Sequence, residues 1–233
     1  MTEFKTYNLF PLTIYKSKIK LDKLEKENLQ NEIFNMEKNS KNLDYKSHNK
    51  AWTGDTQGYE NLHHNKIFDN LLNQIKIHIQ NYIQKLNIDI KQTDIFYQRA
   101  WATISRELEN ISPHIHAQSH VSFAYYLKKS SSEAKILFLD QHKNNEIIPG
   151  LFSSKSVNQK NILKKRDEHN TSAITFDVEE DDIVIFPSKT LHSTQANIRN
   201  ETRISLSADV IILAKDSENL EHLIPSFKNW KKF

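Results

Sequence analysis

The chain has 233 residues, of which 37% are hydrophobic and 26% charged, and its formal net charge at pH 7 is +3. This length suits one sizeable domain, and no run approaches the ~18 apolar residues that a membrane span needs. With no cysteine and only three glycines, the chain excludes disulfides, thiolate metal sites, thiol catalysis and a glycine-rich phosphate loop. The small charge does not favour a nucleic-acid partner, and the absence of an apolar leader predicts a cytoplasmic protein.

The first part of the chain predicts an edge strand and two helices. Residues 7–15 are strand-like, but Pro11 favours the edge of a sheet over its centre. Apolar residues recur at helical spacing over residues 22–39 and again over 68–86, so we expect a helix in each. Residues 51–62 lie between them and are expected to form an ordered loop. The apolar stripe of the second helix indicates that it covers one face of a sheet.

From residue 94 onward the pattern changes to strands. An acidic turn at 179–182 joins two of them and predicts a hairpin. Helices followed by antiparallel strands predict a mostly β fold with N-terminal helices, a double-stranded β-helix or cupin-like jelly roll. We expect one domain over residues 1–233, with a helical buttress at about 20–90 and a jelly-roll core at about 94–213. The expected strands are 95–104, 121–127, 135–140, 172–178, 183–187 and 202–213.

A cluster of histidines lies just before one of these strands. His114, His116 and His120 are three of the chain's eleven histidines. His114 and His116 stand two residues apart, so in an extended backbone they project together, and two neutral imidazoles suit a first-row divalent metal. The alternative is a polar strand end without ligands. His120 is about 13 Å further along a strand, too far for the same metal, so it is either on the substrate side or structural.

Two later positions strengthen the metal hypothesis. His192 follows a buried strand and a short turn, and in a jelly roll it would fold back over the histidine pair. Arg203 and Ser205 share one face of the last strand and would point into the barrel. An arginine with a hydroxyl beside it binds a carboxylate well, and Tyr126 is a further candidate donor. The alternatives are a surface arginine on an edge strand and a core tyrosine.

These residues stand in a pattern that resembles the 2-oxoglutarate- and Fe(II)-dependent oxygenases, and among them a group of bacterial and phage oxygenases. The resemblance covers roughly residues 50–213. The matching positions are Trp101-Ala102, Pro113-His114-x-His116, Ser119, Ser122, Tyr125-Tyr126-Leu127, Phe186-Pro187-Ser188 with His192, and Arg203-Ile204-Ser205.

The resemblance implies a dioxygenase that uses Fe(II), 2-oxoglutarate and O2, releases succinate and CO2, and most often hydroxylates its substrate. The expected substrate is a small or amino-acid-like molecule, with Trp101 and His120 on its side of the site. The loops 51–62 and 141–171 are candidates for closing over it. The residues that the resemblance implies are His114, His116 and His192 for the metal and Arg203, Ser205 and Tyr126 for 2-oxoglutarate.

The chain departs from the family pattern at His116, because the family usually has His-x-Asp or His-x-Glu. Three histidine ligands would leave the metal site one charge unit more positive, unless His116 lies behind the ligands. Phe123 also stands where a small residue is usual. Two alternatives stay open: a cupin-like metal enzyme without 2-oxoglutarate, and a non-catalytic metal-binding jelly roll. Sheet edges and the N-terminal helices could support a homodimer.

Overall fold

The computed structural model describes residues 5–41, 50–129, 134–198 and 200–233. Its longer helices are α1 (Lys23–Lys38) and α2 (Asp69–Lys85), and α3 (Lys155–Gln159) is short. The strands are β1 (Tyr15–Lys18), β2 (Trp52–Thr53), β3 (Thr93–Ser105), β4 (Val121–Lys128), β5 (Ile136–Leu139), β6 (Ala173–Phe176), β7 (Asp182–Pro187), β8 (His192–Thr194) and β9 (Arg203–Ala214). Short 3₁₀ turns are η2 (Gly54–Thr56), η3 (Leu62–His64), η4 (Lys66–Phe68), η5 (Ile90–Gln92) and η6 (Phe227–Asn229).

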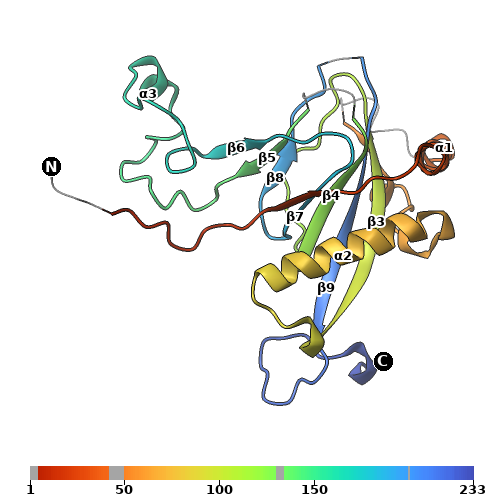
Figure 1. The fold of residues 1–233 in the computed structure, drawn as a ribbon. Helices are drawn as coiled ribbons and strands as arrows, with labels where there is room; N and C mark the ends of the chain where they lie inside the picture. The colour runs from red at the N-terminus through yellow and green to blue at the C-terminus, as the bar shows by residue number, and fades with distance from the viewer. Residues whose placement is uncertain (1–4, 42–49, 130–133, 199) are drawn as a thin grey trace.

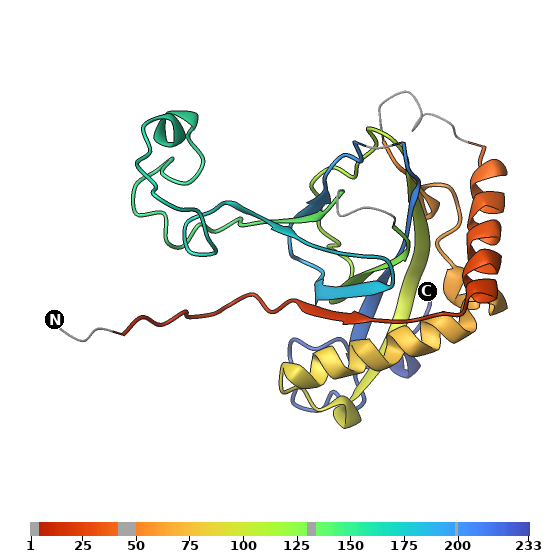
Figure 2. The ribbon, with the colours of Figure 1, turned by 45° about the horizontal axis from the view of Figure 1, so that its top comes forward.

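The strands form two antiparallel sheets. The larger has the order β1-β7-β4-β9-β3-β2 and the smaller the order β6-β5-β8. Both long helices lie on one side of the larger sheet, and the smaller sheet lies on its other side (Figures 1 and 2). This is the double-stranded β-helix that the sequence predicts.

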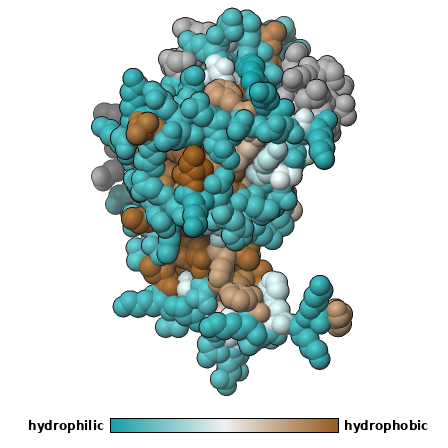
Figure 3. Space-filling model, turned by 90° about the vertical axis from the view of Figure 1, so that its right-hand side faces the viewer, coloured by the Kyte–Doolittle hydropathy of each residue, from teal (hydrophilic) through white to brown (hydrophobic). Residues whose placement is uncertain are grey.

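Both predicted helices are confirmed. The side chain of Asp22 accepts a hydrogen bond of 2.8 Å from the N–H of Glu25 and so caps α1, whose C-cap residue is Asn39. Apolar residues of α1 and α2, such as Leu29 and Ile75, are fully buried against the larger sheet. Seen from the side of α1, the outer surface is mainly hydrophilic (Figure 3). None of the helices in the described segments is long and apolar enough to cross a membrane.

Alternate side chains of a strand point to opposite faces of the sheet, so one face of each central strand packs in the core and the other faces the smaller sheet. In β9, Ile204, Leu206, Ala208 and Val210 belong to the core under the helices. The intervening positions are polar and face the smaller sheet, where three of them line a cavity and Asp209 is buried beside it. The alternating polar positions of β9 are Arg203, Ser205, Ser207 and Asp209.

The predicted hairpin over residues 172–187 is wrong, although both of its strands exist. β6 pairs with β5 in the smaller sheet, whereas β7 pairs with β1 and β4 in the larger sheet. The connection crosses from one sheet to the other, with Asp181 at a positive φ of 70°. A strand–turn–strand pattern specifies that two strands form, but their partners depend on the distant segments that complete each sheet.

The N-terminal strand lies at the sheet edge, as predicted, but it begins at Tyr15 rather than at Tyr7. Residues 5–14 form no strand. β1 is held at the edge by Lys16 and Lys18, whose ammonium groups lie 2.9 and 3.1 Å from the carboxylate oxygens of Asp182 on β7. These ion pairs therefore favour residues 15–18, rather than residues 7–14, as the edge strand of the sheet.

The buried carboxyl of Asp182 predicts a pH-dependent stability. Burial by itself raises its pKa, but the N–H of Glu179 and the two lysines outweigh burial and lower the pKa below the ordinary 3.8. A depressed folded-state pKa contributes stability above the ordinary value, and this stability is lost as pH falls through the folded value. We expect Asp182→Asn to be less stable than the wild type at pH 7 and to lose less stability in acid. Urea unfolding at pH 7 and pH 3 tests this, and equal losses of stability in the two proteins would contradict it.

Candidate active site

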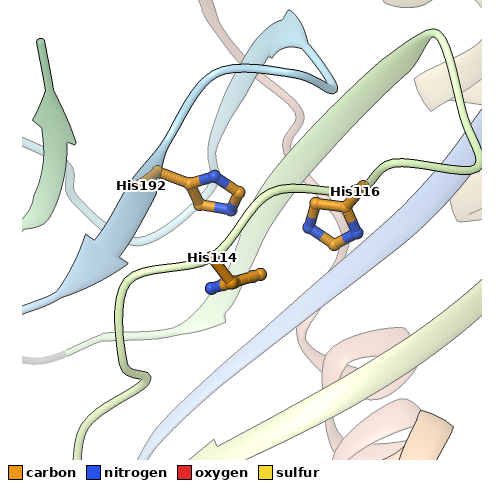
Figure 4. A group of neighbouring side chains, drawn as sticks. All are labelled: His114, His116 and His192. Carbon is orange, nitrogen blue, oxygen red and sulfur yellow. The ribbon is translucent and has the colours of Figure 1, made fainter. Parts of the chain in front are cut away.

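The structure brings the three predicted metal ligands together between the sheets. His114 and His116 lie on the segment between β3 and β4, and His192 begins β8. The main chains of His114 and His192 exchange hydrogen bonds of 2.9 and 3.1 Å, and the N–H of His116 donates to the main-chain oxygen of Ser188. One nitrogen of each ring lies within 4.8 Å of the other two, and the rings surround a common space (Figure 4).

All three rings are oriented by hydrogen bonds at Nδ1. Carbonyl and carboxylate oxygens only accept, so each Nδ1 carries the proton and each Nε2 keeps its lone pair in the neutral ring. This is the arrangement that ligating histidines adopt in metal sites. The acceptors are the main-chain oxygens of Ser112 and Thr190, each 2.8 Å from His114 and His192 respectively, and Oδ1 of Asp209, 2.9 Å from His116.

The surroundings keep two of these rings uncharged. Burial lowers the pKa of His114 below its ordinary value. Burial, together with the neighbouring His114, lowers the pKa of His192 to about 3. Because a histidine binds a metal only in its neutral form, both side chains are in the ligating state at pH 7.

Asp209 on β9 is the central residue of this site that sequence reasoning missed. It is fully buried, and its Oδ2 accepts from Nε and Nη2 of Arg99, at 2.9 and 2.7 Å, and from Nε2 of Gln118 at 2.7 Å. Burial raises the pKa of Asp209, but the hydrogen bonds from His116 and Arg99 outweigh it and lower the pKa to about 2. The period-two spacing of β9 could have indicated its role, because it puts Asp209 on the same face of the strand as Arg203 and Ser205.

Three serines of the sequence pattern form a buried hydrogen-bond chain behind the histidines. Ser188 Oγ lies 2.7 Å from Oγ of Ser119 and 2.8 Å from Oγ of Ser122. Ser119 also donates to Asp209 at 3.2 Å. The chain joins the segment that carries His116 to the turn before His192, so it fixes their spacing.

Arg203 is a buried cation without an anionic partner in the described part of the chain. Its side chain donates to the main-chain oxygen of Ala134 and to Oγ of Ser105, both at 2.9 Å, and to Oγ1 of Thr194 at 3.3 Å. All three acceptors are neutral, and the buried Nε has no hydrogen-bond partner. An unpaired buried charge is costly, so this position fits an anionic ligand that completes the pair.

The histidine cluster and Arg203 line the same cavity, which has a volume of about 740 Å³. All six residues predicted for the metal and for 2-oxoglutarate line it, together with Trp101, whose ring centre lies 5.6 Å from that of His116. Burial raises the pKa of Tyr126 to about 12, so its hydroxyl keeps its proton. The lining residues that were predicted are His114, His116, His192, Arg203, Ser205, Tyr126 and Trp101.

His120 is not brought to the cavity. Its side chain is exposed, and its Nδ1 accepts a hydrogen bond of 3.0 Å from the N–H of Ile212 on β9. His120 is absent from the residues that line the cavity, and this contact with the β9 backbone favours the structural alternative for it. Phe123 contributes atoms to the cavity wall, but it belongs to the core under the helices.

The two loops expected to close over a substrate differ in position. The loop 51–62 contributes Thr53, Asp55, Thr56 and Gln57 to the cavity wall. The segment 141–171 contributes none of the residues that line it. That segment projects away from both sheets together with α3 (Figures 1 and 2), because β5 and β6 extend outward before the chain turns. The structure therefore does not support a lid at 141–171.

Comparisons with known proteins agree with this geometry. Residues 99–209 match the family described as "Putative 2OG-Fe(II) oxygenase". No curated protein matches the chain. The family match includes the histidine cluster, Arg203 and Asp209.

Several solved structures share the fold at low sequence identity. The epimerase SnoN from nogalamycin biosynthesis, an alpha-ketoglutarate-dependent enzyme, is 13% identical, with 88% of this chain and 82% of SnoN covered and a TM-score of 0.55. HygX from Streptomyces hygroscopicus, with nickel and 2-oxoglutarate bound, is 9% identical, with 85% and 82% covered and a TM-score of 0.52. A 2OG-Fe(II) oxygenase-family protein from Burkholderia pseudomallei is 11% identical, with a TM-score of 0.37, and this chain spans only 46% of its length. Residues 99–209 thus match the 2OG-Fe(II) oxygenase family, and the chain has the same fold as solved 2-oxoglutarate-dependent enzymes.

Proposed function

We propose that this protein is a 2-oxoglutarate- and Fe(II)-dependent dioxygenase that hydroxylates a small molecule. His114, His116 and His192 would hold the iron, and Arg203 would pair with the far carboxylate of 2-oxoglutarate. The observation that carries the proposal is that a histidine cluster and an unpaired buried arginine line one cavity. HygX, which has the same fold, contains 2-oxoglutarate in its structure.

The residues of the chain have distinct tasks in this proposal. Iron with bound 2-oxoglutarate would supply the oxidising chemistry with O2 as cosubstrate and succinate and CO2 as products. In the neutral form of each ring, the hydrogen bond at Nδ1 leaves Nε2 free of a proton. Asp209 orients His116 and places a negative charge behind it. The guanidinium of Arg203 and the hydroxyl groups of Ser205 and Tyr126 can donate to a carboxylate, with burial excluding the water that would compete for these groups.

The two alternatives have less support. In a cupin-like enzyme without 2-oxoglutarate, the buried positive charge of Arg203 would have no anionic ligand to pair with. A structural metal site is normally closed by four protein ligands. Within the described residues, the cluster that could hold a metal contains three.

Anaerobic titration of the metal-free protein with Fe(II) and then 2-oxoglutarate tests the proposal. We expect a visible charge-transfer band of the chelated 2-oxo acid, and we expect His114→Ala to lose it. His120→Ala is the matched control, because this histidine is exposed and lies outside the cavity, and it should retain the band. Iron binding without a band would favour the cupin-like alternative, and no iron binding would refute the proposal.

A further inference from the structure

We propose that Asp55 binds a positively charged group of the substrate, so that the substrate class is a small molecule carrying an ammonium or guanidinium group. The inference rests on the proposed function, because it takes the cavity of the histidine cluster as the active site. Beyond the proposed function, it specifies that the substrate is positively charged.

A tight turn fixes Asp55 at the cavity wall. Asp55 lies in η2, directly after the edge strand β2. The carbonyl oxygen of Gly54 accepts from the N–H groups of Gln57 and Tyr59, at 3.0 and 2.8 Å. A Cβ atom at Gly54 would lie only 3.1 Å from the main-chain oxygen of Tyr59 and 3.4 Å from that of Ala102 on β3. The turn is therefore packed closely against the sheet, and the position of Asp55 is set by the backbone.

The carboxylate of Asp55 has no partner within the described residues. Its Oδ1 atom is buried without a hydrogen bond, and no lysine or arginine of the described segments forms an ion pair with it. Buried polar atoms in native proteins are normally paired, so an unpaired one at a cavity wall marks a place that a ligand completes. Asp55 and His114 line the same cavity.

The charges around the cavity leave Asp55 as the position for a cation. Among the described residues that line the cavity, Asp55 is the only carboxylate, and the cations are Lys50, Arg99 and Arg203. Arg99 is already paired with Asp209, and Arg203 is assigned to 2-oxoglutarate. Thr53, Thr56 and Gln57 line the same cavity and carry neutral hydrogen-bonding groups. A substrate cation would form a charge-assisted pair with this carboxylate.

A role of Asp55 as a fourth metal ligand is less favoured by the geometry. The group of ligand atoms that lie within 4.8 Å of one another contains the three histidines and not Asp55. Removal of the carboxylate should lower the affinity for iron if Asp55 is a metal ligand and leave it unchanged if Asp55 binds the substrate. The test below separates the two roles.

The test compares lysine and arginine with derivatives that lack their cations. The probes are L-lysine against Nα,Nε-diacetyl-L-lysine and L-arginine against Nα-acetyl-L-citrulline. Their dissociation constants are measured by calorimetry, both on the metal-free protein and on the anaerobic protein with Fe(II) and 2-oxoglutarate. We expect the cationic probes to bind about 10- to 100-fold more tightly, as a charge-assisted hydrogen bond predicts. Asp55→Asn should remove this preference and keep the iron affinity and the charge-transfer band.

Glu221→Gln is the matched control, since Glu221 is an exposed carboxylate in the C-terminal segment, and it should keep the preference. Equal affinity of the wild type for charged and neutral probes would overturn the inference. So would a loss of iron affinity in Asp55→Asn, which would make Asp55 a metal ligand. If the wild type forms no charge-transfer band, the proposed function fails, and the calorimetry on the metal-free protein still decides whether the cavity selects cations.

Discussion

Replacing Arg203 by methionine is expected to abolish 2-oxoglutarate binding at ordinary concentrations without unfolding the protein. Arg203 is 3% exposed, and the acceptors of its hydrogen bonds are neutral oxygens of Ala134, Ser105 and Thr194. Removing one partner of a buried charge pair typically costs 2–5 kcal/mol of binding free energy, which is about 30-fold to several thousand-fold in affinity. The charge-transfer band in an anaerobic titration measures this loss directly.

The same substitution should leave the metal-free protein at least as stable as the wild type. Methionine fills a similar volume and removes a buried charge that lacks an anionic partner, and such replacements are often neutral or stabilising. Thermal unfolding without metal checks this expectation. Arg203→Lys is the control, because it keeps the charge and loses the planar fork, and it should bind 2-oxoglutarate with intermediate affinity. Wild-type affinity in the methionine variant would contradict the assignment of Arg203.

Replacing Asp209 by asparagine is expected to weaken metal binding by about 10- to 100-fold, as the loss of an outer partner of a ligating histidine typically does. The carboxylate of Asp209 accepts hydrogen bonds from His116, Ser119, Gln118 and Arg99. An asparagine amide would place its own N–H groups against some of these donors and would leave Arg99 without its counter-charge. His116 would then lose both its orientation and the negative charge behind it.

The dissociation constant for Fe(II), measured anaerobically, tests this prediction. Asp182→Asn provides a matched control, because it also removes a buried carboxylate but lies outside the cavity lining. It should bind iron as tightly as the wild type. Unchanged iron affinity in Asp209→Asn would show that the contact between His116 and Asp209 serves only the fold.

This contact also offers a physical account of the departure from the family pattern at His116. A histidine in place of a carboxylate ligand removes one negative charge from the metal site. The buried carboxylate of Asp209 is hydrogen-bonded to Nδ1 of His116. In the proposed site, this carboxylate would supply a negative charge behind the histidine in place of the missing carboxylate ligand. Its low pKa, about 2, means that the charge persists across the physiological range.

The sequence by itself determined the features that depend on short-range patterns. The helical spacing and the capping residue Asp22 defined α1, and period-two alternation placed Arg203 and Ser205 on the inner face of β9. The motif around His114, His116 and His192 predicted a cluster of histidines, which the structure brings together, and their roles as metal ligands stay a prediction. These patterns could be read because each is set by residues only a few positions apart.

The tertiary structure alone decided which distant segments meet. It separated β6 from β7, because each strand completes a different sheet, and it joined His114 to His192 through main-chain hydrogen bonds. It placed Asp209 behind His116 and Asp55 at the cavity wall, and it turned the segment 141–171 away. Hydrogen bonding and charge pairing across long sequence separations fix these positions, and a linear pattern of residue types does not specify such partners.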